Sequence, residues 1–126
     1  MDRKYVLTAL GYGVLGMALG VYMGISQNHA QHVTHAHILL LGMVVSFIYA
    51  IIHKLWITDG TTTLSRVQYY CHQVGILVMF IGLFCFYQGL LPGEKIGPVL
   101  SLASVVVFAG VVLMKVLFIK STRKAG

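Results

Sequence analysis

The chain of 126 residues is 58% hydrophobic and only 10% charged, which leaves too little polar surface to cover a soluble globular protein. A mean hydropathy of +0.86 favours an integral membrane protein instead. The formal charge of +6 does not indicate nucleic-acid binding, because the basic residues lie at the ends of apolar stretches and not along one face.

Four apolar stretches are long enough to cross a bilayer, for which about 20 residues are needed. They cover residues 5–25, 35–56, 67–90 and 96–119. We therefore predict an all-α fold in which residues 1–126 form a single domain, a four-span helix bundle in the lipid bilayer. The first stretch exceeds a signal-peptide core and has no small-residue cleavage site after it, so we expect it to be retained.

Basic residues are divided unequally between the two ends of these stretches. Lys95 alone falls on one side. The other eight fall on the side of the termini and the middle loop: Arg3, Lys4, Lys54, Arg66, Lys115, Lys120, Arg123 and Lys124. Loops rich in Lys and Arg stay in the cytoplasm, so both termini are predicted to be cytoplasmic and the loop around His29 to lie outside.

Glycines form a ridge on the first stretch. Gly16, Gly20 and Gly24 recur every four residues, with Gly13 nearby. Such a face lets another helix approach closely. The alternative is that the flat face makes room for a planar cofactor.

Four histidines, here called the outer histidines, lie around the start of the second stretch. Histidines are costly to bury in a bilayer unless a metal, a proton or a hydrogen-bond partner satisfies them. The pair two residues apart is separated by about 200° on a helix and must point in different directions. Closely spaced imidazoles also suit copper or zinc. The outer histidines are His29, His32, His35 and His37.

The two remaining histidines, His53 and His72, are here called the inner histidines. The middle loop folds them back to within one or two turns of the same depth, whereas His37 lies about 24 Å from His53 along a straight helix. Histidines on facing helices are typical axial ligands of haem. Within one bundle His53 and His72 form the natural pair, and pairing His37 with His72 requires tilt, a shifted register or a second subunit.

Several other chemistries are excluded. The acidic residues Asp2, Asp59 and Glu94 all lie outside the spans, which argues against a carboxylate proton pump and against paired-carboxylate hydrolases. No P-loop or nucleophile elbow is present. Covalent haem attachment needs C-x-x-C-H, and Gln68 occupies the first cysteine position before Cys71.

Three segments carry a family resemblance: residues 16–24 of the glycine helix, residues 35–42, and residues 66–75. With them the chain resembles a widespread family of small four-helix bacterial membrane proteins similar to cytochrome oxidase subunit I and to nitric-oxide-response haem proteins. The recurring marks of that family fall on His35, His37, Gly42 and His72. The resemblance implies haem or a haem–copper-like centre in the bacterial inner membrane. It also implies an aromatic residue where this chain has His53, which weakens the inner pair.

Taken together, these patterns predict a non-covalent b-type haem that serves electron transfer or diatomic-gas sensing. His72 is the first candidate axial ligand, His37 and His35 the next, and His53 a local partner. One alternative is a copper- or zinc-binding protein that uses His29, His32, His35 and His37. Another is an accessory subunit of a respiratory complex. We also expect a homo-oligomer and a respiratory-chain partner, and no oxygen reduction by this chain alone, since it lacks the helices of a complete oxidase.

Overall fold

The computed structural model describes residues 1–57 and 59–125, with side chains up to residue 123, and the regular structure in that part is helical throughout. Its first rod is α1 (Asp2–Ser26). The second rod joins α2 (His32–His37), the π-helical segment η1 (Ile38–Val44) and α3 (Val45–Leu55). The third and fourth rods are α4 (Thr63–Tyr87) and α5 (Gly93–Ala125). The predicted all-α four-helix architecture is confirmed.

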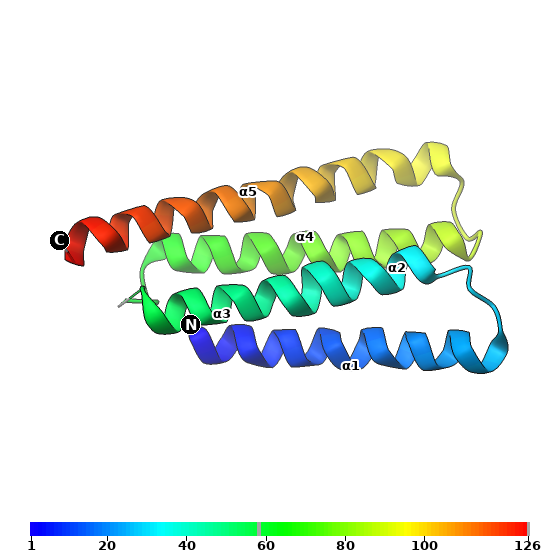
Figure 1. Ribbon diagram of the computed structural model, residues 1–126. Helices are drawn as coiled ribbons and strands as arrows, with labels where there is room; N and C mark the ends of the chain where they lie inside the picture. Colours follow the sequence, from blue (N-terminus) through cyan, green and yellow to red (C-terminus); the bar gives the residue numbers. More distant parts are fainter. Residues whose placement is uncertain (58, 126) are drawn as a thin grey trace.

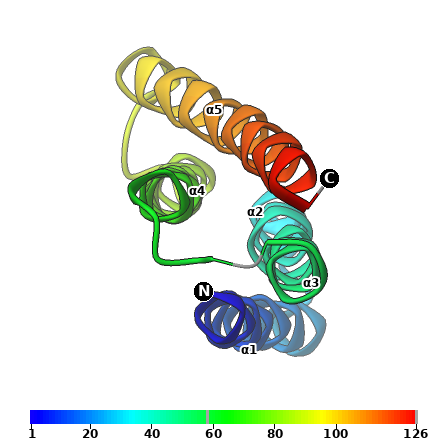
Figure 2. The same ribbon diagram turned by 90° about the vertical axis from the view of Figure 1, so that its left-hand side faces the viewer.

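The four rods run antiparallel, with both termini at the same end of the bundle (Figure 1). Seen end-on, α1 and α5 lie on opposite sides of the second rod (Figure 2). α5 packs chiefly on α4, and α1 packs on η1 and α3. Four helical segments are long and apolar enough to cross a bilayer, namely Asp2–Ser26, His32–Leu55, Thr63–Tyr87 and Gly93–Arg123. These are the dimensions of a multi-pass membrane protein.

The helix bounds differ from the predicted spans where polar residues extend a helix. α4 begins at Thr63, four residues before the predicted start, because Thr62 caps it by accepting a hydrogen bond from the Ser65 backbone N–H at 3.2 Å. α4 also ends earlier than predicted, at Tyr87, and Gly89 beyond it adopts a φ of +72°. The early start places His72 nine residues inside its helix, and therefore deeper in the bundle than the sequence indicates.

The glycine ridge of α1 is filled by side chains of the second rod. A Cβ added at Gly16 would lie 2.6 Å from Leu39, and one at Gly20 would lie 2.8 Å from His35 Cε1. A Cβ at Gly13 would lie 3.0 Å from Met43 Sδ, whereas the space beside Gly24 is open. The ridge is therefore a close helix contact at three of its four glycines, as the first interpretation predicts.

The segment η1 begins directly after His37 and is π-helical, with the wider turn of i→i+5 hydrogen bonds. Short π-helical segments inside α-helices are rare, and many of those that occur lie at functional sites. The widened turn changes which face of the rod each following residue occupies. Leu41, in the middle of η1, thereby presents its carbonyl to α4, where the candidate site lies.

Candidate functional site

His72 is the most deeply buried histidine of the bundle. Its side chain is 0% exposed. Nε2 lies 3.1 Å from the carbonyl oxygen of Leu41 and 3.4 Å from Ser46 Oγ, so α4 meets η1 and α3 at this ring. Because a carbonyl can only accept a hydrogen bond, Nε2 carries the proton in the neutral imidazole. Nδ1 then holds a lone pair, and it is buried without a hydrogen-bond partner.

One anchored and one free ring nitrogen are a feature that metal-ligating imidazoles share. Ligating histidines commonly donate their other ring N–H to a backbone carbonyl or carboxylate, which fixes the tautomer and the ring orientation. For His72, the backbone carbonyl of Leu41 is this acceptor. The neutral His72 ring therefore keeps one lone pair without a partner in the core of the bundle.

Tyrosine rings surround the inner histidines. The Tyr49 ring lies edge-on to His72 with 5.0 Å between centroids, and Tyr5 lies 6.5 Å from His72. Tyr5 also stacks on His53, with centroids 5.6 Å apart and planes inclined by 29°. One tyrosine ring from α1 therefore lies beside both inner histidines.

The two tyrosine hydroxyls differ in their partners. The Tyr5 hydroxyl donates to Gln68 Oε1, and Gln68 Nε2 donates to the Gly110 carbonyl at 3.1 Å, which links α1, α4 and α5. The Tyr49 hydroxyl is buried and has no hydrogen-bond partner. Tyr49 is therefore the less firmly held of the two rings beside His72.

His53 is 4% exposed, and neither of its ring nitrogens has a hydrogen-bond partner. It lies in the wall of a polar pocket of about 280 Å³ at the end of the bundle, together with Asp2, Lys54 and Gly60. Ser46, which contacts His72, is seven residues earlier on the same rod, about 10 Å at the α-helical rise. The two inner histidines thus differ in depth by about two turns.

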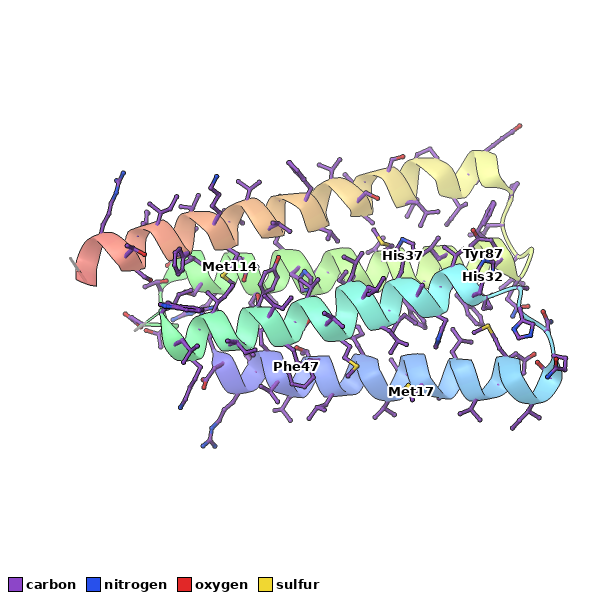
Figure 3. All side chains as sticks on the ribbon, viewed as in Figure 1. Met17, His32, His37, Phe47, Tyr87 and Met114 are labelled. Carbon is purple, nitrogen blue, oxygen red and sulfur yellow. The ribbon has the colours of Figure 1, made fainter. Side chains whose placement is uncertain are left out.

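The outer pair His35 and His37 points in two directions, as predicted. His35 Nδ1 lies 2.8 Å from the Gly16 carbonyl oxygen of α1. His37 Nδ1 lies 2.8 Å from the Val33 carbonyl oxygen of its own rod, and the ring borders a small pocket with Ile76 of α4. Figure 3 shows His37 further along the bundle axis from the loop end than His32.

The other two outer histidines, His29 and His32, are exposed. His32 Nδ1 lies 3.0 Å from the His29 carbonyl oxygen. Across residues 1–57 and 59–125, no three His, Cys, Asp or Glu side chains are gathered in a group that can hold a metal ion. The structure therefore places both inner histidines beside Tyr5 and, among the described residues, does not gather the outer four into a metal-binding group.

Sequence reasoning missed the residues that build this environment. The sequence prediction gives no role to Ser46, Tyr5, Tyr49 or Gln68. The available signal was the presence of polar groups well inside apolar stretches, where each needs a partner. Which of them meet at one site depends on how the helices pack.

Comparisons with protein-family models, with curated proteins and with solved structures find no match for this chain.

Proposed function

We propose that this chain is a membrane haem-binding protein in which His72 is an axial ligand of a b-type haem, for electron transfer or for sensing a diatomic gas. The observation that carries the proposal is the state of His72. Its Nε2 is anchored on Leu41, and its buried Nδ1 has no partner. A buried polar atom without a partner costs about 1–3 kcal/mol, and a ligand at Nδ1 removes that cost.

His53 is the local partner in this proposal, although it lies about two turns from the level of His72 along the second rod. His53 has two unpartnered nitrogens and contacts the same Tyr5 ring as His72. Because His72 is fully covered, a planar cofactor at Nδ1 would require a neighbouring ring to move. Tyr49 is the candidate, because its hydroxyl has no hydrogen bond that the movement would break. A haem bound here supplies one-electron or gas-binding chemistry. His72 holds it, and the apolar core excludes water.

The proposal includes a location and partners. We propose a bacterial inner membrane as the location, which the distribution of basic residues and the family resemblance support. Electron transfer needs a redox partner, for which a respiratory-chain protein is proposed, and self-association remains part of the proposal. The copper or zinc alternative has less support, because His32, His35 and His37 each contact a different backbone carbonyl.

An optical spectrum of the detergent-purified protein, oxidised and dithionite-reduced, tests the proposal when metal analysis is made on the same sample. We expect a Soret band with reduced α and β bands that is absent from His72→Ala and present in the matched control His32→Ala. A colourless protein that contains copper or zinc contradicts the proposal, as does a haem spectrum that His72→Ala leaves intact.

A further inference from the structure

A groove of about 450 Å³ runs along the outer face of α4, beside α5. Its lining is almost wholly apolar, and Val67, Tyr70 and Val74 in its wall are about half exposed (50%, 53% and 53%). Val106 contributes the α5 side. Figure 2 shows α4 at the edge of the bundle. This surface, here called the α4 groove, therefore faces the bilayer and not the His72 site.

The end of the α4 groove nearest the chain termini is positively charged. Arg66 lies in its wall and donates from Nη2 to the Thr61 carbonyl at 2.9 Å. Lys4 of α1 reaches the same place, with Nζ 3.4 Å from the Tyr70 hydroxyl and 5.2 Å from the centre of the Tyr70 ring. Tyr70 is thus flanked by two cations from two helices.

Neither of these two cations forms an ion pair in the part of the chain that the structure describes. The ion pair that the structure records within its described residues joins the Met1 amine to Asp2 at 3.7 Å. In that part of the chain neither Arg66 nor Lys4 is paired with an acidic side chain. Both therefore keep their charge available to an anion at the membrane surface, where anionic lipids attract Lys and Arg.

We propose that the α4 groove binds one anionic phospholipid, with its phosphate at Arg66 and Lys4 and an acyl chain along Val74 and Val106. The occupant must be apolar over most of its length and anionic at one end, which matches this lipid class. A second copy of the chain would bring its own Arg66 and Lys4 against these, since a two-fold contact places the same surface on both sides. A neutral quinone head group would leave both cations unpaired.

Native mass spectrometry of the full chain in a mild detergent tests the proposal, with dioleoyl phosphatidylglycerol and dioleoyl phosphatidylcholine as probes. We expect a one-to-one phosphatidylglycerol adduct and weaker binding of the zwitterionic lipid. A Lys or Arg near the surface contributes about a fivefold difference in affinity. Arg66→Gln should therefore weaken phosphatidylglycerol binding about fivefold, and Arg66→Gln with Lys4→Gln about 25-fold.

Two further variants separate the effect of the two cations from the effect of the shape of the α4 groove. Lys95→Gln, at the opposite end of the bundle, is the matched control and should leave the affinity unchanged. Val74→Trp fills the groove without a change of charge and should weaken binding of both lipids, with gel filtration as the check on folding. The probes do not depend on bound haem, so this result stands apart from the test of His72.

Four outcomes overturn the proposal. The first is equal affinity for the two lipids, and the second is no effect of the Arg66 and Lys4 substitutions. The third is a dimer mass that Val74→Trp abolishes, which assigns the α4 groove to contact between copies of the chain. A neutral quinone that binds with equal affinity to wild type and Arg66→Gln, and that displaces phosphatidylglycerol, also contradicts it.

Discussion

The outer and inner histidines differ in what their ring nitrogens contact. Among the outer four, His32, His35 and His37 each place Nδ1 against a backbone carbonyl. The inner two leave three buried nitrogens without partners, two on His53 and one on His72. The denser group in the sequence is thus the better satisfied one. In a membrane bundle a buried donor or acceptor without a partner needs an explanation, and the inner histidines hold three such nitrogens.

The largest effect expected is that of His72→Ala. It removes a fully buried ring that joins α4 to Leu41 and Ser46, and the cavity left behind should lower the free energy of unfolding by about 2 kcal/mol or more. Titration of the folded protein with sodium dodecyl sulfate measures this change. An unfolding midpoint equal to that of wild type would show that the His72 contacts do not hold the bundle together.

Gly20→Ala tests the hydrogen-bonded state of the outer histidine His35. Its new Cβ would lie 2.8 Å from His35 Cε1, so the imidazole must shift away from the Gly16 carbonyl. We expect a loss of about 1–3 kcal/mol in the free energy of unfolding, with any haem spectrum unchanged. Gly24→Ala, where the space is open, is the control and should be neutral or slightly stabilising. Loss of the haem spectrum in Gly20→Ala would instead assign His35 to the cofactor.

The two tyrosines beside the inner histidines provide a matched pair of substitutions, each removing one hydroxyl. Tyr5→Phe breaks the hydrogen bond to Gln68 and should cost about 1 kcal/mol of unfolding free energy. Tyr49→Phe removes a hydroxyl without a partner and should be neutral or stabilising in the cofactor-free protein. The same detergent titration measures both. Equal losses in the two variants would mean that the Tyr49 hydroxyl is bonded in solution.

The smallest effect expected is that of replacing both exposed outer histidines. The double variant His29→Ala, His32→Ala should change the free energy of unfolding by less than about 0.5 kcal/mol, because exposed side chains contribute little. Isothermal titration with Zn²⁺ or Cu²⁺ completes the test. Tight one-to-one metal binding by wild type that this variant loses would restore the copper or zinc alternative.

Local patterns in the sequence predict the four helices, the glycine contact of α1 and the divergence of His35 and His37, because each depends on hydrophobicity, helical spacing or residue size. The π-helical segment after His37 carries no local signal. Without that segment, and without the early start of α4 at Thr63, the contact between His72 and Leu41 is not foreseeable. His53 beside Lys54 resembles an interfacial residue, and its burial comes from Tyr5 and Gly60, which are distant in sequence.

The most direct test of His72 as the cofactor ligand is the reduced-minus-oxidised spectrum of His72→Gly, recorded without and with added imidazole. A free imidazole can enter the space that the missing side chain leaves and supply the lost nitrogen. We expect no haem bands without imidazole and their return when it is added. Haem bands in His72→Gly without imidazole, at the intensity of wild type, would contradict the assignment of His72.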